Sequence, residues 1–205
     1  MSEKKRGELA SSTFQDNDSA PAPVPQKVRQ AAADLKWAGQ IGFWVQLILG
    51  VISTVTVLFA SSSFIGPDNT ANTQGTELGV FSAILGLIAL GISVYYSFRY
   101  MAIAKMLQNP NSSQRPNRAD TIKVIRAGLV VNLVGMLLTI IGAEANVGLV
   151  LAKSLANPPG AIAGLDPKKL VNSIDLLVIQ ANTNTIAAHF SGIVSSLLLL
   201  NRITR

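Results

Sequence analysis

LLVIQANTNTIAAHFSGIVSSLLLL, residues 176–200, is apolar and long enough to cross a bilayer, which takes about 20 mostly apolar residues. Its first half nevertheless carries amide and hydroxyl side chains, and its middle carries His189, the only histidine of the chain. Polar groups left unpaired in hydrocarbon cost several kcal/mol each. We therefore expect these side chains to face other helices, a bound ligand or water inside a protein that crosses the membrane several times.

The composition agrees with this expectation. Hydrophobic residues make up 49% of the 205 residues and charged residues 14%, and the mean hydropathy is +0.39. These values lie outside the range of ordinary soluble domains. The absence of cysteine excludes disulfides, thiolate metal sites and cysteine nucleophiles. The basic residues behind the net charge of +6 flank apolar segments, which is typical of membrane topology and not of nucleic-acid binding.

Three earlier segments are also apolar enough to span a membrane. The predicted spans are residues 38–60, 77–98, 128–151 and 176–200. Residues 26–37 are predicted to form an interfacial helix that leads into the first span, and residues 99–108 to continue the second span as helix. Asp120 is predicted to cap the helix of the third span. The polar, proline-rich residues 1–25 predict a disordered tail, which leaves residues 26–205 as one membrane domain.

The positions of lysine and arginine predict the orientation. Six lie before residue 37, none in 61–76, six in 99–126, three in 152–173 and two in the C-terminal tail. By the positive-inside rule, both termini and the middle loop face the cytoplasm or its organellar equivalent. The predicted fold is therefore an all-α polytopic membrane protein, an antiparallel bundle of four transmembrane helices with both termini cytoplasmic.

Each predicted span carries a stripe of small and polar residues at steps of three and four. Such residues allow close helix packing and hydrogen bonds between helices in lipid. The small members are interpreted as packing seams, and the polar ones either as hydrogen-bonding contacts between helices or as a solute path. The stripes are Gly39, Gly42, Gln46, Gly50, Ser53 and Val57; Gly79, Ser82, Gly86, Ala89, Ser93 and Ser97; Asn132, Gly135, Thr139, Gly142 and Asn146; and Asn182, Thr185, His189, Gly192 and Ser196.

Glu144 departs from this pattern, because a carboxyl group inside a span is costly and is a functional candidate by default. It points about 160° away from Asn146 around the helix, toward a groove with an earlier span or an oligomer contact. Helix rise places Glu144 and Asn184 about 24 Å from the cytoplasmic ends of their spans and His189 about 16 Å. Glu144 and His189 are therefore too far apart to share one metal ion, and no resident metal or cofactor is predicted. The candidate path residues are Glu144, His189, Asn146, Gln180, Asn182 and Asn184.

Enzyme motifs are absent from the sequence. It contains no H-E-x-x-H, no G-x-S-x-G and no Walker A pattern. One histidine and one intramembrane carboxylate are only a weak indication of acid–base catalysis. We therefore do not expect an enzyme.

Two blocks of the sequence resemble the permease-in-chloroplasts family. They are VIQANTNTIAAHF at 178–190 and the stretch 131–145, which runs from Val-Asn-Leu to Gly-Ala-Glu-Ala and is preceded by Arg-Ala-Asp at 118–120. This family comprises four-span proteins of the chloroplast inner envelope and their cyanobacterial relatives. The resemblance implies either permease work in iron uptake or a subunit associated with the inner-envelope protein import channel. Because no long transit peptide is visible, a cyanobacterial-type member of the plasma or thylakoid membrane is expected.

Two functional hypotheses follow. The leading one is an integral membrane permease component for an ion or small solute, with iron as the cargo that the resemblance implies. The alternative is a structural or assembly subunit of a larger membrane complex, such as a protein import translocon, that transports nothing itself. The expected partners are the lipid bilayer, a metal ion, and a second copy or a larger membrane complex, but no nucleic acid.

Overall fold

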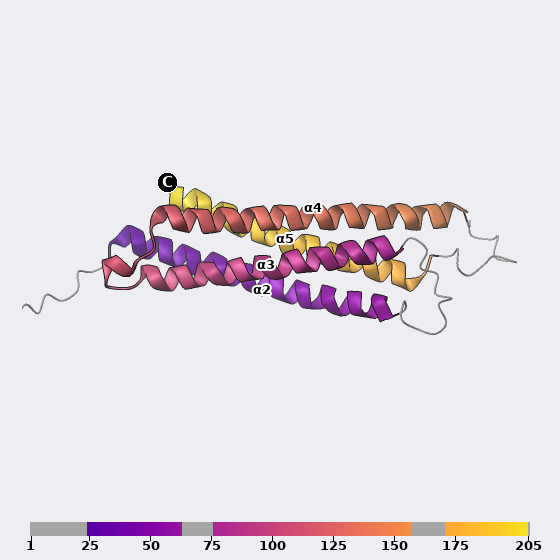
Figure 1. Cartoon of the computed structure of the whole chain (residues 1–205), viewed down its shortest axis with the longest axis horizontal. Coiled ribbons are helices and arrows are strands. Elements are labelled where there is room, and N and C mark those ends of the chain that lie inside the picture. Colours follow the sequence, from indigo (N-terminus) through magenta and orange to yellow (C-terminus); the bar gives the residue numbers. More distant parts are fainter. Residues whose placement is uncertain (1–23, 63–75, 157–170, 205) are drawn as a thin grey trace, which may run out of the picture.

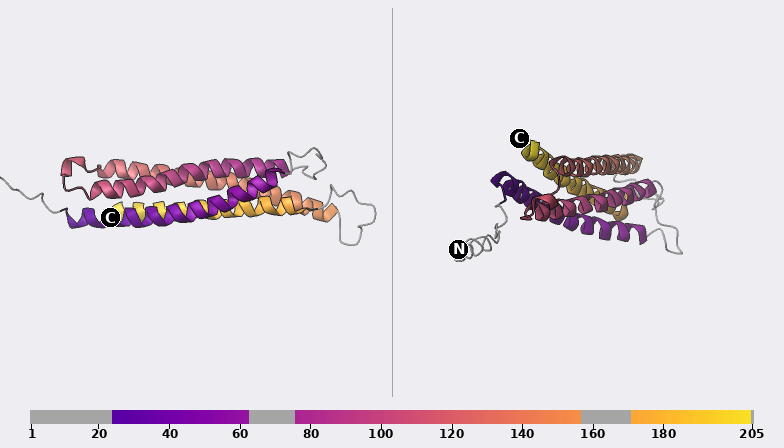
Figure 2. Two further views of the ribbon diagram at one scale, coloured as in Figure 1. Left: turned by 90° about the horizontal axis from the view of Figure 1, so that it is seen from below. Right: turned by 60° about the vertical axis from the view of Figure 1, so that its left-hand side comes forward.

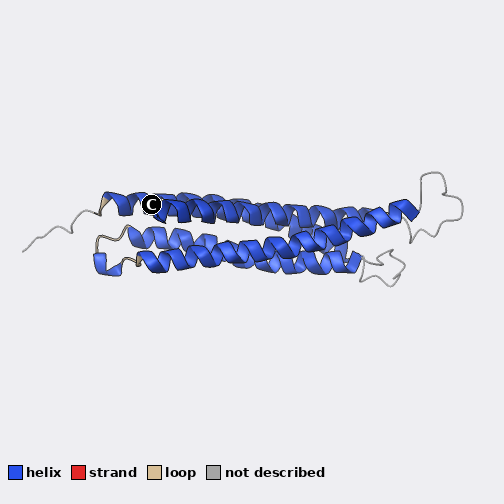
Figure 3. Ribbon diagram, turned by 90° about the horizontal axis from the view of Figure 1, so that it is seen from above, coloured by secondary structure: helices blue, strands red, loops and turns tan. Residues whose placement is uncertain are grey.

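The computed structural model describes residues 24–62, 76–156 and 171–204. These residues form four long helices and one short 3-10 turn, and no strand occurs among them (Figures 1 and 3). The elements are α2 (Gln26–Ser62), α3 (Thr76–Leu107), η1 (Ser112–Gln114), α4 (Arg118–Ala156) and α5 (Ser173–Thr204). The predicted all-α class and four-helix bundle are confirmed, whereas the tail predicted at 1–25 falls almost entirely outside the described residues.

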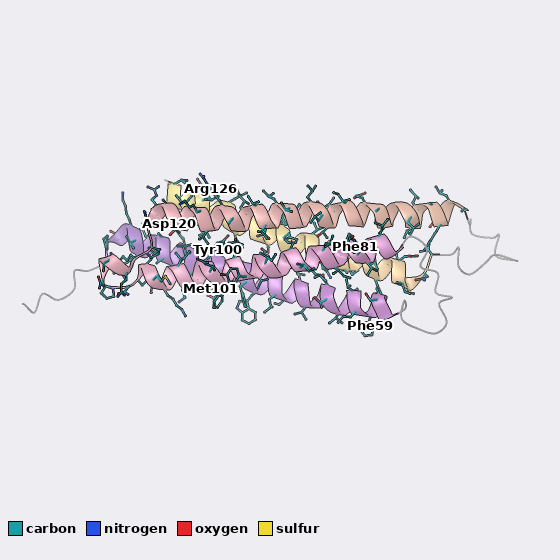
Figure 4. The ribbon with its side chains drawn as sticks, in the orientation of Figure 1. Phe59, Phe81, Tyr100, Met101, Asp120 and Arg126 are labelled. Carbon is teal, nitrogen blue, oxygen red and sulfur yellow. The ribbon has the colours of Figure 1, made fainter. Side chains whose placement is uncertain are left out.

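The outer surface of the bundle is apolar. All four long helices have the length and hydropathy needed to cross a membrane. Large apolar side chains such as Phe59 and Phe81 point away from the bundle, with 67% and 60% of their surface exposed (Figure 4). A surface of this kind is stable in lipid and not in water, so the chain is a multi-pass membrane protein.

The helices run antiparallel in the cyclic order α2, α3, α4, α5, and α3 also contacts α5 across the diagonal. In the left view of Figure 2, α3 and the start of α4 lie above α5 and the start of α2 at one end, and α2 and α4 cross between the two layers toward the other end. The start of α2 and the end of α5 meet, because Asp34 and Arg202 form an ion pair of 3.4 Å. We call this the terminal end of the bundle and the opposite end the loop end. That the terminal end faces the cytoplasm remains a prediction from the basic residues.

The helix boundaries agree with the predicted continuations but not with the predicted cap. α2 begins at Gln26 and runs without a break through the first span, and α3 continues to Leu107. The N-cap of α4 is Asn117, whose Oδ1 accepts a hydrogen bond of 3.3 Å from the backbone N–H of Ala119. The prediction for Asp120 is wrong, because this residue already lies in the first turn of α4 and pairs with Lys123.

Two apolar clusters lie at the two ends of the bundle interior. The cluster at the terminal end comprises Leu35, Ala38, Tyr100, Ile103, Ala104, Ile125 and Leu199. The cluster toward the loop end comprises Val57, Ala60, Val80, Ala83, Val178 and Ala181. Between these clusters the buried residues are mostly glycine, serine, threonine, amides and one histidine. The interior of the bundle is therefore most polar where the protein crosses the middle of the membrane.

Candidate functional site along the bundle axis

A hydrogen-bond network centred on Asn132 joins all four helices. The Oδ1 atom of Asn132 in α4 accepts hydrogen bonds from Nε2 of Gln46 in α2, at 3.0 Å, and from Oγ of Ser93 in α3, at 2.7 Å. Nδ1 of His189 in α5 lies 3.1 Å from the same oxygen. The four side chains are between 0% and 2% exposed. One amide oxygen therefore connects the whole cross-section of the bundle.

Each amide nitrogen and oxygen of this network has at least one hydrogen-bond partner. Gln46 donates from Nε2 to Ser93 at 2.8 Å as well as to Asn132, and its Oε1 accepts from Oγ of Ser97 at 3.1 Å. Asn132 donates from Nδ2 to the carbonyl oxygen of Gly128 at 2.9 Å. Because buried amides need partners in lipid, this closed set of bonds explains how the network tolerates its depth.

His189 is the member of the network whose hydrogen bonding can change. Its Nδ1 faces Oδ1 of Asn132, and its Nε2 lies 3.3 Å from the carbonyl oxygen of Gly86. Both neighbours are acceptors, whereas a neutral imidazole carries a single N–H. The neutral ring therefore donates to one of these oxygens at a time, and the two tautomers bind different helices, α4 or α3.

Three glycines allow the helices to approach closely enough for these contacts. A Cβ atom on Gly192 would overlap Nε2 of Gln46 and Oδ1 of Asn132. A Cβ atom on Gly135 would overlap the ring of His189, and one on Gly86 would overlap Oγ1 of a threonine of α4. The small residues of the predicted stripes thus form packing seams, as the sequence indicated.

Toward the loop end, the next layer contains hydroxyl groups. Thr139 and Thr185 are fully buried, and their hydroxyls donate to the backbone carbonyls four residues earlier, at 2.7 and 2.9 Å. Ser53 of α2 donates at 3.0 Å to the carbonyl oxygen of Ala181. Each of these oxygens keeps acceptor capacity on the bundle axis, because a hydroxyl has two lone pairs.

Two amides beyond this layer have hydrogen-bonding capacity that the protein does not fill. Asn146 is 1% exposed, and neither its Nδ2 nor its Oδ1 has a hydrogen-bond partner among the residues that the structure describes. Asn182 is fully buried and donates from Nδ2 to the carbonyl of Val178 at 3.1 Å, but its Oδ1 has no partner. An unsatisfied buried amide is costly, so these atoms favour a polar guest in this half of the bundle.

Polar groups also lie at both ends of this line. At the loop end, Nζ of Lys153 contacts Oδ2 of Asp175 at 3.0 Å, and the aspartate side chain is fully buried. At the terminal end, the hydroxyls of Tyr100 and Ser196 are 3.2 Å apart. From Ser196 to Asp175, helix α5 rises about 32 Å, close to the roughly 30 Å of a bilayer core. We call this line of buried polar side chains the polar axis.

Three of the six predicted path residues lie on the polar axis, and three do not. His189, Asn146 and Asn182 are buried inside the bundle. Glu144 and Gln180 are exposed on the outer surface, where Gln180 donates to the partly exposed Asn184 at 3.1 Å. Glu144 and Asn184 therefore lie at a similar height to the two buried asparagines but do not join them inside the bundle. Residues two positions apart point in nearly opposite directions on a helix, which separates 144 from 146, and 180 and 184 from 182.

The candidate set drawn from the sequence omitted the residues of α2 and α3. Gln46, Ser93 and Ser97 belong to the network, and Asn132 is its centre. Their positions in the three- and four-residue stripes were the signal that could have found them. Among the described residues, no group of three or more His, Asp or Glu side chains could hold a metal ion. Amide, hydroxyl and imidazole groups therefore supply the contacts along the axis.

Comparison with known proteins agrees with the resemblance seen in the sequence. The chain is 33% identical over 190 residues to "Protein TIC 21, chloroplastic" of Arabidopsis thaliana. The aligned region covers 89% of this chain and 61% of that protein, so the chain spans less than two thirds of its relative. No solved structure matches the chain significantly. The family model described as "Protein of unknown function (DUF3611)" matches residues 25–204, nearly the whole of the membrane bundle, and the chain therefore belongs to the DUF3611 family.

Proposed function

We propose that the protein is a permease component that moves an ion or a small polar solute along the polar axis. One observation carries this proposal. Over a distance close to the thickness of the bilayer core, buried polar side chains recur inside the bundle, alongside the apolar cluster toward the loop end, while the outer surface is apolar. Close packing of helices in lipid requires only small residues. Asn146 and Asn182 instead bury amide atoms that have no hydrogen-bond partner among the described residues. A passing solute would supply the partners that these atoms lack.

The donor groups indicate the kind of cargo. Amide and hydroxyl oxygens together with one imidazole suit ferrous or manganous ions better than cuprous ions, which prefer sulfur ligands. Iron is the cargo suggested by the resemblance to the permease-in-chloroplasts family. The described residues include no cluster of acidic or histidine ligands that could hold a metal ion. The cargo would therefore contact the side chains of the polar axis one after another, without a fixed binding site. The matching location is a cyanobacterial plasma or thylakoid membrane.

The network around Asn132 would act as the gate of this path. It closes the cross-section of the bundle with side chains from four helices, so a solute passes only when these hydrogen bonds break. His189 would allow the gate to change without a large movement of the helices. When the imidazole changes tautomer, its hydrogen bond to Asn132 of α4 is replaced by one to the carbonyl oxygen of Gly86 in α3. The glycine seams allow the helices to slide or separate without clashes between large side chains.

Flux through purified protein tests the proposal. Proteoliposomes containing a metal-sensitive dye are exposed to ferrous ion under reducing conditions, and the initial rate of dye response is measured. We expect His189→Ala and Asn146→Leu each to change the rate by about tenfold or more, because each alters the gate or the unfilled amide. Gly91→Ala is the matched control, since a Cβ atom there meets nothing within 4 Å. Equal rates for all variants, or no flux above empty liposomes, would refute the permease.

A second function is favoured by a different observation. Every amide atom of Gln46 and Asn132 has a hydrogen-bond partner within the protein, as expected of a purely structural contact between helices. A structural or assembly subunit would show no flux and would instead purify, in mild detergent, as part of a stable complex with other membrane proteins. In that case His189→Ala would reduce the yield of the complex and leave metal content unchanged.

A further inference from the structure

Glu144 places a carboxyl group on the outer surface of α4, among residues that face lipid. Ile141 and Leu151 on the same face are 60% and 57% exposed, so apolar surface continues on both sides of the carboxyl group. Glu144 forms no ion pair or hydrogen bond with another described residue. Ionisable groups within spans almost always face a protein interior or water, because contact with hydrocarbon is costly. On this face of α4, the carboxyl group of Glu144 therefore lacks a polar partner among the described residues of a single copy.

Gly148 lies one turn beyond Glu144 on the same face. A Cβ atom there would meet nothing within 4 Å, in contrast to Gly192 and Gly135, whose small size is needed inside the bundle. Ala152 follows four residues later and is also exposed, which gives a small-x-x-x-small spacing. This spacing allows another helix to approach closely in lipid. Among the described residues, no other helix of the same copy packs closely against Gly148.

Gln180 on the outer surface of α5 lies at the same height as Glu144. The antiparallel register is set by the contact of Gly135 with the ring of His189. Glu144 is nine residues beyond Gly135, and Gln180 is nine residues before His189, so each lies about 13.5 Å from that contact toward the loop end. Nε2 of Gln180 donates to Asn184 at 3.1 Å, and an amide nitrogen carries a second hydrogen.

We propose that the outer face of α4 in one copy packs against the outer face of α5 in the next copy, with Glu144 accepting a hydrogen bond from Gln180 of that neighbour. Every copy enters the membrane in the same orientation, so acceptor and donor meet at the same depth in each contact. A twofold contact between two α4 helices would instead bring carboxylate against carboxylate. A contact between two different faces repeats from copy to copy around an axis along the membrane normal, and it forms a ring where the rotation between copies closes.

Disulfide cross-linking distinguishes this contact from its alternatives, because the chain has no cysteine of its own. Gly148 and Leu176 are level, 13 residues on either side of the Gly135–His189 contact, and both are exposed. Copies carrying Gly148→Cys and copies carrying Leu176→Cys are co-expressed with different tags and oxidised in the membrane. We expect a cross-linked dimer that carries both tags. Gly91→Cys, on the exposed face of α3, replaces Gly148→Cys in the control and gives no such dimer.

Each other outcome of this experiment is decisive. Cross-linking of Gly148→Cys to itself alone would show a twofold contact through α4 and overturn the proposal. Cross-linking to a different protein would show that the face binds another membrane subunit and not a second copy. Absence of any cross-link between the two tagged forms would also overturn it.

The oligomeric state gives an independent measurement. In mild detergent, light scattering or native mass spectrometry should find an oligomer of the wild-type chain. Gly148→Leu and Glu144→Leu should each raise the dissociation constant about tenfold, whereas Gly91→Leu leaves it unchanged. Circular dichroism should report the same helix content and thermal midpoint for all variants, because all three positions are exposed on the outer surface of the single copy. A monomeric wild type, or equal dissociation constants, would refute the contact whatever the outcome of the flux measurements.

Discussion

At the scale of single residues, the stability of the interior depends on Asn132. Its Oδ1 is contacted from three other helices, and its Nδ2 satisfies a carbonyl of its own helix. Replacement by a residue of similar volume without polar atoms would leave the donors of Gln46 and Ser93 facing hydrocarbon. The cost of such unpaired donors exceeds the value of any one hydrogen bond that is lost.

Asn132→Leu is therefore expected to lower the free energy of unfolding by about 1–3 kcal/mol. Unfolding is followed by circular dichroism in mixed micelles with increasing SDS. The matched control is Thr183→Val, which removes an exposed hydroxyl that bonds only to the carbonyl of Ile179 in its own helix. We expect the control to change stability by less than about 0.5 kcal/mol. Equal losses for the two variants would show that the network contributes nothing specific.

Glycines that look alike in the sequence differ in what surrounds them. Gly192→Ala forces a methyl group against Gln46 and Asn132, so we expect a loss of about 1–3 kcal/mol from overpacking. Gly91→Ala adds a methyl group in open space and a better helix former, and should be neutral or stabilising by up to about 1 kcal/mol. The same SDS titration compares them. A smaller effect at Gly192 than at Gly91 would contradict the packing described for the network.

At the scale of helices, an ion pair joins α4 to α5 at the loop end. Lys153 contacts both carboxylate oxygens of Asp175, at 3.2 and 3.0 Å, while Asp175 also accepts from the backbone N–H of Asn172. The pair connects the last turn of α4 with the first turn of α5. Because the aspartate is buried and the lysine nearly so, solvent screens this interaction weakly.

A double-mutant cycle with Lys153→Met and Asp175→Leu measures this connection. We expect each single variant to be destabilised and the double variant to lose less than the sum of the two. The coupling free energy should be at least about 1 kcal/mol, since truncating one partner of a buried pair strands the other. Additive losses would mean that the two groups contribute independently of their contact.

The sequence predicted the inner faces of the helices well because their periodicity is repeated four times. Polar residues such as Gln46 and His189 recur with glycine at steps averaging 3.5 residues, and this pattern is visible without a structure. The polar residues of the outer faces could not be separated from them by composition or depth. Glu144 and Gln180 share the height of the interior amides; helix periodicity turns them away from Asn146 and Asn182, but only the packed bundle shows that this other face is the outer surface.

At the scale of the whole molecule, the two ends differ in charge. The turn between α3 and α4, including η1, and both described ends of the chain lie at the terminal end and carry most of the basic residues. The positive-inside rule therefore assigns this end to the cytoplasm. Asn111 is exposed in that turn, so its position reports the orientation of all four helices.

Labelling of Asn111→Cys with a membrane-impermeant maleimide tests the orientation. In intact cells of a bacterial host we expect little labelling, and after lysis we expect full labelling, because the positive-inside rule predicts that the turn faces the cytoplasm. Since the wild-type chain has no cysteine, the signal comes from this position alone. Strong labelling of intact cells would reverse the assigned orientation and leave the bundle itself unchanged.

The apolar cluster at the terminal end has a mechanical consequence. Its members Leu35, Ile103 and Ile125 lie beyond the predicted spans, so they exclude water in a part of the bundle that projects from the lipid. In this projecting part, the hydrophobic effect stabilises the contacts between the helices. Inside the lipid it does not contribute to helix association. Any spreading of the four helices would therefore meet resistance from the hydrophobic effect at the terminal end, and from the Lys153–Asp175 ion pair at the loop end. A change that opens the bundle must therefore break different interactions at its two ends.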